Sequence, residues 1–305
     1  MSNDGNSMPV KGRTNTEGVY MSESCGHNCG SCGEQNCGDR THAQTDFTAP
    51  LGKLSKVDKV IAIVSGKGGV GKSLVTGLLA SSLAKKNIHT AVLDADITGP
   101  SIPKMFGIKG RPTVLEQGLV PMRSGGGVDI VSMNMLLPDD SEAVLWRGPI
   151  LAGVVKQFWS EAIWKDIQVM FVDMPPGTGD IPLTVFQSLP VDGIIIVTSP
   201  QDLVTMIVEK AIRMANLMEI PIIGLVENLS YFLCPDNGKK YQIFGESKAE
   251  AVAKENGIPL LAQIPIDPAL AASCDRGEVE KFPTPFLEGL IEAIEKTPKR
   301  EKKAS

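Results

Sequence analysis

Residues 60–73 read Val-Ile-Ala-Ile-Val-Ser-Gly-Lys-Gly-Gly-Val-Gly-Lys-Ser, and this stretch decides the fold. It opens with an apolar run of the length of a strand, and residues 66–73 match the pattern G-x-x-x-x-G-K-[ST] in full. Glycine lets backbone N–H groups converge on phosphate oxygens without interference from a Cβ atom, and the following helix adds its positive end. The stretch therefore predicts a strand, a phosphate-binding loop and a helix in succession.

The predicted loop assigns roles to two of its side chains. We expect Lys72 to reach the β- and γ-phosphates of ATP, and the Ser73 hydroxyl to bind Mg²⁺. A glycine-rich turn without a ligand is the alternative. The nucleotide contacts expected from this loop are Gly66, Lys67, Gly68, Gly69, Val70, Gly71, Lys72 and Ser73.

Short apolar runs alternate with helical stretches along the rest of the chain. Strands are expected at residues 60–64, 90–93, 128–133, 169–172, 193–198, 222–226 and 260–264. Helices are expected at residues 72–86, 150–163, 203–218, 247–256 and 286–296. Apolar strands that alternate with helices predict the α/β class with a mostly parallel, doubly wound sheet, buried on both faces. Such sheets bind ligands at the C-terminal ends of their strands, where the motifs lie.

Composition divides the chain into three parts. Residues 1–57 are rich in Gly, Ser, Asn, Thr and Asp, which predicts a flexible segment, and residues 297–305 form a basic tail that we expect to be disordered. Residues 58–296 are the predicted ATPase domain. The helix expected at residues 286–296 has an apolar side that could dip into a membrane surface or dock on the sheet. Docking is favoured, because its glutamates would be repelled by anionic lipid.

Charge and apolar runs limit the possible partners. The 305 residues carry a formal net charge of −5, which argues against a global electrostatic interaction with nucleic acid or anionic lipid. The first twenty residues are polar, and no apolar run is long enough to cross a bilayer. We therefore expect a cytoplasmic protein with neither a nucleic acid nor a membrane as its partner. Thiols stay reduced there, so the six cysteines are expected to be metal ligands or buried thiols.

Carboxylates follow two of the expected strands. Asp94 and Asp96 end the second strand, where carboxylates position Mg²⁺ or an attacking water. The strand at residues 169–172 ends in Asp173, and an apolar strand with this ending is the Walker B pattern, in which the aspartate holds Mg²⁺, often through water. The next residues, 174–180, read Met-Pro-Pro-Gly-Thr-Gly-Asp and are suited to sensing a γ-phosphate, the alternative being a simple tight turn.

The phosphate loop holds a second lysine, Lys67, and thereby resembles the deviant Walker A motif of the MinD, ParA and nitrogenase iron protein class. The resemblance implies that Lys67 crosses a dimer interface to the partner's nucleotide and that Asp96 orients the attacking water. Lys67, Lys72 and Asp96 are then the catalytic residues. A solvated lysine on a mobile loop is the alternative for Lys67.

From Lys59 to Ile294 the chain resembles the Mrp/Nbp35/ApbC family of iron–sulfur cluster carrier ATPases. The motifs are SGKGGVGKS (65–73), DADITGPS (94–101), DMPPGTGD (173–180), TSPQDL (198–203), VENLSYF (226–232) and IFGE (243–246). The resemblance implies a homodimer that binds ATP, hydrolyses it slowly and passes a [4Fe–4S] cluster to apoproteins. It also implies that Asn228 and the turn containing Pro265 and Asp267 flank the adenine. The Asn228 amide supplies a donor and an acceptor, which fits a purine edge.

One motif departs from the family. The family usually carries Cys-Pro-x-Cys after Ser-Tyr-Phe, and two such cysteines from each subunit would hold a cluster that bridges the dimer. Here the chain reads Cys234-Pro-Asp-Asn237. The amide of Asn237 is a hard, neutral ligand and matches iron–sulfur chemistry poorly. The departure therefore puts the bridging cluster in doubt. Cys234 is a possible cluster ligand, because it lies where the family places one.

Four cysteines gather near the N-terminus, namely Cys25, Cys29, Cys32 and Cys37. Four thiols on a glycine-rich stretch are able to wrap one tetrahedral or cubane centre, and we expect a [4Fe–4S] cluster. The Nbp35 branch likewise has an N-terminal four-cysteine cluster site, with a longer first interval. Structural zinc, with His27 as a substitute ligand, and incidental or redox thiols are the alternatives. Cys274 is expected to be a buried thiol at a helix end.

Two other functions remain open. The first is a positioning ATPase that binds membrane or DNA, as MinD and ParA do; the N-terminal cysteines and the acidic balance argue against it. The second is an electron donor similar to the nitrogenase reductase. This function needs a redox-active bridging cluster, and the presence of Asn237 in place of the second cysteine argues against it.

Overall fold

The computed structural model describes residues 48–96, 101–136, 148–200 and 204–299. The predicted four-cysteine site at Cys25, Cys29, Cys32 and Cys37 lies outside the described residues, so it stays a prediction. Contacts begin before the predicted boundary at residue 57. The Ala49 amide donates to the Ser188 carbonyl at 2.9 Å, and the indole of Trp159 donates to the Ala49 carbonyl at 2.9 Å.

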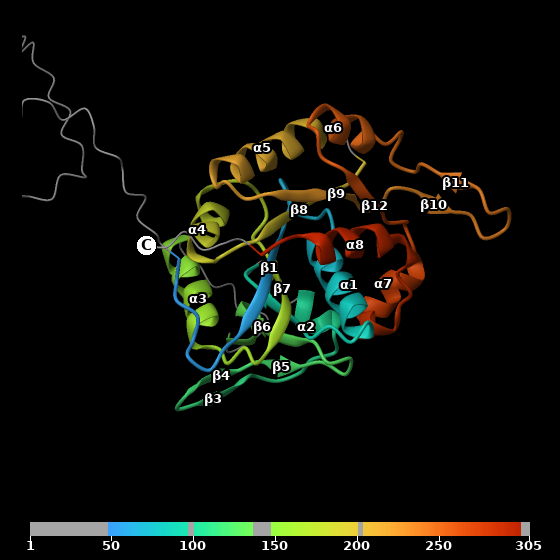
Figure 1. Ribbon diagram of the computed structural model, residues 1–305. Helices are drawn as coiled ribbons and strands as arrows, with labels where there is room; N and C mark the ends of the chain where they lie inside the picture. Colours follow the sequence, from blue (N-terminus) through green and yellow to red (C-terminus); the bar gives the residue numbers. More distant parts are fainter. Residues whose placement is uncertain (1–47, 97–100, 137–147, 201–203, 300–305) are drawn as a thin grey trace, which may run out of the picture. The chain divides into compact units, whose positions relative to one another are not determined.

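An eight-stranded sheet organises the described chain, in the order β12-β9-β8-β1-β7-β2-β6-β5 (Figure 1). Neighbouring strands run parallel except for β5, which pairs antiparallel with β6 at one edge. The strands are β1 (Val57–Val64), β2 (Thr90–Asp94), β5 (Met122–Arg123), β6 (Asp129–Ser132), β7 (Ile167–Asp173), β8 (Gly193–Thr198), β9 (Ile222–Glu227) and β12 (Leu260–Gln263). The predicted mostly parallel sheet is confirmed.

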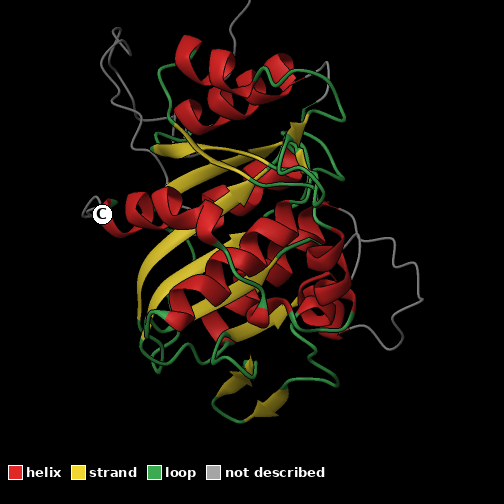
Figure 2. Ribbon diagram, turned by 90° about the vertical axis from the view of Figure 1, so that its right-hand side faces the viewer, coloured by secondary structure: helices red, strands yellow, loops and turns green. Residues whose placement is uncertain are grey.

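Helices cover both faces of this sheet (Figures 1 and 2). One face carries α1 (Lys72–Lys85), α2 (Ser101–Met105), α7 (Pro268–Asp275) and α8 (Glu288–Lys296). The other carries α3 (Gly148–Glu161), α4 (Asp180–Ser188), α5 (Val204–Leu217) and α6 (Ala249–Glu255). The doubly wound arrangement expected from the alternation of strands and helices is therefore confirmed.

The central strand β1 shows why its sequence is apolar at successive positions. Val60, Ala62 and Val64 pack in the cluster beneath α3 to α6, whereas Ile61 and Ile63 pack in the cluster beneath α1, α2, α7 and α8. Side chains alternate between the faces of a strand, so a strand buried on both faces must be apolar throughout. The burial of this strand fixes the loop that follows it at the carboxyl edge of the sheet.

Several short elements lie outside the sequence-based expectations. Two hairpins stand apart from the main sheet, β3 (Thr113–Leu115) with β4 (Gly118–Val120), and β10 (Phe232–Leu233) with β11 (Lys240–Tyr241). The helices α2 and α4 were not predicted either. Strands of two or three residues and the five-residue α2 are too short for hydrophobic periodicity to identify them. The nine residues of α4 include Pro182, which weakens a helical assignment from sequence.

The C-terminal helix α8 docks on the sheet. Its residues Leu290, Ile291 and Ile294 are buried in the same cluster as α1, which confirms docking over dipping into a membrane surface. A 3₁₀ turn (Pro285–Leu287) precedes the helix, so the α-helix begins two residues later than expected. Among the described residues, none of the helices combines the length and the apolar character that crossing a bilayer requires.

Candidate functional site

The phosphate loop joins the end of β1 to the start of α1. Gly71 takes the position before the helix with φ of 86°, in the left-handed region that favours glycine. A Cβ atom on Gly71 would lie 2.1 Å from Nδ2 of Asn228, so this position also needs the absence of a side chain. The close approach brings the end of β9 against the loop.

Lys72 lies between two carboxylates. Its Nζ is 2.8 Å from Oδ1 of Asp173 and 3.2 Å from Oδ2 of Asp96, and the lysine side chain is only 5% exposed. Burial disfavours the ammonium, but the charges of Asp173 and Asp96 outweigh that effect and raise the pKa of Lys72. Lys72 therefore carries a positive charge at neutral pH, as a ligand for phosphate oxygens must.

Asp173 accepts hydrogen bonds from two hydroxyl groups of α1. Ser73 donates to its Oδ2 at 2.5 Å, and Thr76 donates to its Oδ1 at 2.9 Å. The two side chains expected to hold Mg²⁺, Ser73 and Asp173, thus lie within one hydrogen bond of each other. Carboxylate and hydroxyl oxygens are the hard ligands that this ion prefers, so the residues fit it. Thr76 was not predicted; its spacing of three from Ser73 places it on the same helix face, but its contact with Asp173 depends on how α1 packs against β7.

Asp94 and Asp96 differ in their surroundings. Asp94 is buried, and burial followed by the charge of Asp173 raises its pKa well above the usual range. Its Oδ2 accepts from Ser132 at 2.7 Å and its Oδ1 from the Asp96 amide at 3.0 Å. Asn134 donates to the Asp96 carbonyl at 3.1 Å. Asp94 thus supports the turn that presents Asp96 to Lys72.

Ser132 and Asn134 were not predicted as part of the site. They lie at and beyond the end of β6, which pairs with β2. The sequence signal for them is the polar ending of a strand that neighbours a motif strand in a parallel sheet.

Asn228 has one satisfied and one unsatisfied side-chain atom. Its Nδ2 donates to the Val70 carbonyl at 2.9 Å, and its backbone amide donates to the Thr198 carbonyl at 2.8 Å. Its Oδ1 is buried and has no hydrogen-bond partner among the described residues. Because Nδ2 must face a carbonyl, the free acceptor is fixed in place. A buried acceptor of this kind fits a donor such as the exocyclic amine of adenine.

The turn after β12 is hydrogen-bonded to residues 227–230, which contain Asn228. The Ile264 amide donates to the Glu227 carbonyl at 2.8 Å, and the Ser230 amide donates to the Ile264 carbonyl at 2.9 Å. The turn continues through Pro265 to Asp267, whose Oδ1 caps α7 by accepting from the Ala269 amide at 2.7 Å. The residues expected around the base therefore share one edge of the sheet, and their contact with adenine stays a prediction.

The loop after β7 rests against the phosphate loop. The Gly177 amide donates to the Ser65 carbonyl at 2.8 Å, and Gly177 has φ of 96°. Lys67 is half-buried in the phosphate loop beside it. Residues 174–179 thus contact the phosphate loop directly, through the hydrogen bond between Gly177 and Ser65, as a segment that senses the γ-phosphate would need to do.

Comparison with known proteins assigns this arrangement to a family. The sequence profile of the ParA/NUBPL iron-transfer P-loop NTPase family matches residues 56–296. The chain belongs to this family. The expected resemblance to cluster carrier ATPases is thereby confirmed.

Individual relatives agree with the assignment. The iron–sulfur cluster carrier protein of Methanocaldococcus jannaschii is 42% identical over 257 residues, which cover 83% of this chain and 89% of the relative. A nucleotide-binding protein of Archaeoglobus fulgidus, solved in complex with ADP, is 40% identical with a TM-score of 0.69, over 76% of this chain and 91% of the other. The cell division ATPase MinD of Pyrococcus furiosus shares the fold, at 21% identity and a TM-score of 0.55 over 78% of this chain and 98% of the other.

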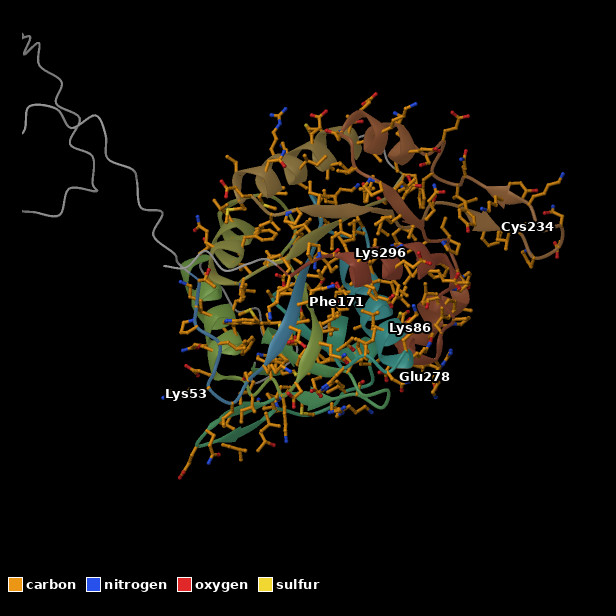
Figure 3. The ribbon with its side chains drawn as sticks, in the orientation of Figure 1. Lys53, Lys86, Phe171, Cys234, Glu278 and Lys296 are labelled. Carbon is orange, nitrogen blue, oxygen red and sulfur yellow. The ribbon has the colours of Figure 1, made fainter. Side chains whose placement is uncertain are left out.

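In this NUBPL-family chain, Cys234 lies on the β10–β11 hairpin (Figure 3). Its amide donates to the Lys239 carbonyl at 3.0 Å, and the side chain of Asn237 accepts from the Lys239 amide at 2.9 Å. Asn237 therefore stabilises the turn at the position where the family usually has its second cysteine. Cys234 is half-buried and free, and its role as a cluster ligand stays a prediction.

Cys274, near the end of α7, is half-buried, not fully buried as expected for a core thiol. Burial and the charge of Asp275 raise its pKa, so it is a poor thiolate at neutral pH. Among the described residues, His, Cys, Asp and Glu do not form a group of three or more that could hold a metal ion.

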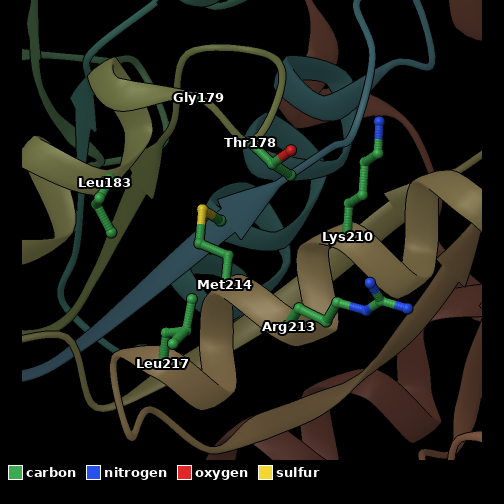
Figure 4. Close-up of a pocket in the computed structure, with 7 residues that line it drawn as sticks. All are labelled: Thr178, Gly179, Leu183, Lys210, Arg213, Met214 and Leu217. Atoms are coloured by element: carbon green, nitrogen blue, oxygen red, sulfur yellow. The ribbon is translucent and has the colours of Figure 1, made fainter.

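A small pocket opens between α4 and α5 of this family member (Figure 4). It is lined by residues of α4 and α5 and of the loop after β7, namely Thr178, Gly179, Leu183, Lys210, Arg213, Met214 and Leu217. It lies on the α3–α6 face, and the nucleotide residues described above do not line it.

Proposed function

We propose that this protein is a slow ATPase that works as a homodimer in the cytoplasm and carries a [4Fe–4S] cluster to apoproteins. The observation that supports ATP hydrolysis most strongly is the position of Lys72 between Asp96 and Asp173, next to the Ser73 hydroxyl. The carriage of a cluster is supported by the family and by relatives named iron–sulfur cluster carrier proteins.

In this proposal the site residues divide the chemistry between them. Lys72 binds the β- and γ-phosphates and stabilises the charge that develops on their oxygens. Ser73 and Asp173 hold Mg²⁺, which neutralises phosphate charge when it is bound. Asp96, whose Oδ2 lies 3.2 Å from the Lys72 Nζ, orients the water that attacks the γ-phosphate. Lys67 reaches the nucleotide of the partner subunit.

The cluster in this proposal is the cargo, held by the four N-terminal cysteines Cys25, Cys29, Cys32 and Cys37. Four thiolates are the usual ligand set of a cubane cluster. Cys234 adds one further thiol per subunit on the hairpin. Asn237 serves the turn there, so we place the cargo at the N-terminal cysteines.

The Asn228 amide predicts a preference for ATP over GTP. Its fixed Oδ1 accepts from the amine of adenine, whereas guanine presents a carbonyl oxygen to the same position. Asn228→Ala is expected to weaken ATP binding about tenfold and to reduce the preference over GTP, measured by competitive calorimetry.

Asn256→Ala is a matched control for this experiment. The Asn256 amide also donates to a backbone carbonyl, that of Val252 at 2.9 Å, but it ends α6 and does not contact the phosphate loop. This variant should bind both nucleotides as the parent does. Equal binding of ATP and GTP by the parent protein would contradict the role of Asn228.

The second lysine of the loop tests the dimer. If Lys67 completes the site of the partner subunit, Lys67→Ala should lose most of its hydrolysis and still bind ATP as a monomer. Lys86→Ala, which removes an exposed lysine paired with Glu295, is the control. The turnover of ATP is measured for each variant. Light scattering gives the oligomeric state of the same samples with and without ATP. Turnover at the parent rate in Lys67→Ala would show that the lysine has no part in catalysis.

A further inference from the structure

A buried carboxylate next to the base site has no role in the chemistry above. Glu227 ends β9, directly before Asn228, and is 0% exposed. Its Oε2 accepts from Ser230 Oγ at 2.5 Å and from Gln263 Nε2 at 2.9 Å, and its Oε1 accepts from Ser247 Oγ at 2.7 Å. A buried carboxylate needs such donors, because otherwise its desolvation is unfavourable.

The three donors come from three separate segments. Ser230 and Ser247 flank residues 231–246, so one carboxylate binds both ends of that segment, one through each oxygen. Gln263 ends β12, directly before the turn expected to flank adenine, and also donates to Ser230 at 3.0 Å. The Ser247 hydroxyl additionally accepts from the Ala249 amide, where α6 begins, at 3.2 Å.

The segment held in this way, residues 231–246, contains the β10–β11 hairpin, which projects from the edge of the sheet (Figures 1 and 3). It carries Cys234 and four exposed apolar side chains, namely Leu233, Tyr241, Ile243 and Phe244. Its other attachment is close by, because the Ile266 amide donates to the Tyr231 carbonyl at 2.7 Å. The hairpin is thus anchored where the base-site turns meet.

The turn between these anchors has an unusual backbone. Leu229, between Asn228 and Ser230, has φ of 58°, in the left-handed region that leucine rarely adopts. The hydrogen bond from Ser230 to Glu227 closes this turn. Strained conformations persist where the surroundings over-determine them, and here the surroundings are the Glu227 carboxylate and the contact of Asn228 with Val70.

We propose that Glu227 is a positioning residue that couples the nucleotide site to the β10–β11 hairpin. A nucleotide that engages Asn228 restrains the turn at residues 228–230, and Glu227 extends this restraint to both ends of residues 231–246. The hairpin is therefore more ordered when nucleotide is bound. By linkage, whatever binds the hairpin changes the affinity for nucleotide by the same factor. This coupling rests on the proposed nucleotide-binding function.

Hydrogen exchange of the full-length chain, read by mass spectrometry with and without Mg-ADP, tests the coupling. In the parent protein ADP should slow the exchange of amides in residues 231–246 at least about fivefold. The internal control is the β3–β4 hairpin, which also exposes apolar side chains, Val114 and Leu115, and lies apart from the β10–β11 hairpin in the fold (Figure 1). Its exchange should not respond to ADP.

Variants separate coupling from stability. Glu227→Ala should reduce the ADP effect on residues 231–246 to less than about twofold, and Glu227→Gln, which keeps one acceptor oxygen, should restore part of it. Glu280→Gln is the matched control, because Glu280 also holds a loop, accepting from Ser124 at 2.6 Å and from the Gly126 amide at 2.9 Å. If Glu227→Ala does not fold, Ser247→Ala removes only the donor at the far end of the segment and should weaken the effect.

The outcomes are distinct. An ADP effect of parental size in Glu227→Ala, or in Ser247→Ala where that variant replaces it, would overturn the role of Glu227. Binding of ADP by calorimetry without any slowing in the parent hairpin would overturn the coupling and leave the proposed ATPase standing. Absence of ADP binding to the parent would overturn the proposed function and the coupling with it.

Discussion

Replacing Lys72 with alanine is expected to lower ATP hydrolysis by at least about 10²–10³-fold, because the charge on the transferring phosphate loses its cation. Steady-state phosphate release measures the effect. Lys85→Ala is the matched control, since Lys85 lies on the same helix and its exposed ammonium donates to the Phe282 carbonyl at 2.9 Å. Hydrolysis at the parent rate in pure Lys72→Ala would remove the phosphate loop from the catalytic site.

Loss of Lys72 also leaves Asp173 buried without its cation, and breaking such a buried pair costs about 3–5 kcal/mol of stability. Thermal unfolding must therefore accompany the assay. Lys72→Met keeps the volume of the aliphatic stem and removes only the charge. If both variants remain folded at the assay temperature, their shared loss of turnover reports on catalysis and not on unfolding.

Removal of the N-terminal cysteines is expected to have the second large effect. A chain that begins at Asp46 should fail to bind iron or develop colour on anaerobic reconstitution with iron and sulfide, and should still bind ATP. The cut at residue 46 keeps the hydrogen bonds of Ala49 with Ser188 and Trp159, which a cut near Lys56 would remove. A full-length variant with serine at Cys25, Cys29, Cys32 and Cys37 gives the same test without shortening the chain.

Cys234 on the β10–β11 hairpin is the alternative location of the cluster, and iron uptake by the shortened chain tests that location as well. One Cys234 from each subunit supplies only two of the four thiolates that a cubane normally requires, and Asn237 is committed to its turn. A shared cluster at the dimer interface would leave about two irons per subunit in the shortened chain. A shortened chain that takes up the full complement of iron would contradict the N-terminal location and return the cluster to the hairpin. Zinc in the full-length protein, found by metal analysis, would favour the structural alternative.

The strand, loop and Walker motifs could be predicted because each is contiguous in the sequence. Residues 60–73 specify β1, the phosphate loop and the start of α1, and the apolar run before Asp173 specifies β7. The family assignment followed from the same motifs and is confirmed. Local patterns suffice here because burial on both faces demands apolar runs, and phosphate binding demands glycine.

The remaining features depend on contacts between distant segments. Thr76 joins the site only because α1 places it over β7, and Glu227 meets Ser247 and Gln263 only after β9, α6 and β12 have assembled. The hairpins are too short to show periodicity, and Pro182 near the start of α4 weakens its helical pattern. The role of Asn237 in its turn appears only when its hydrogen bond to the Lys239 amide is seen. A sequence pattern offers no distance across the fold, so these features had to come from the structure.

Transfer of a cluster is the most direct test of the proposed carrier function. The full-length protein is reconstituted anaerobically with iron and sulfide, its metal is counted, and it is mixed with an apo-dehydratase whose activity requires a [4Fe–4S] cluster, with and without Mg-ATP. We predict a bound cluster with the visible absorption of a cubane, and recovery of dehydratase activity that responds to the nucleotide. A protein that hydrolyses ATP but takes up neither iron nor sulfide would contradict the proposal.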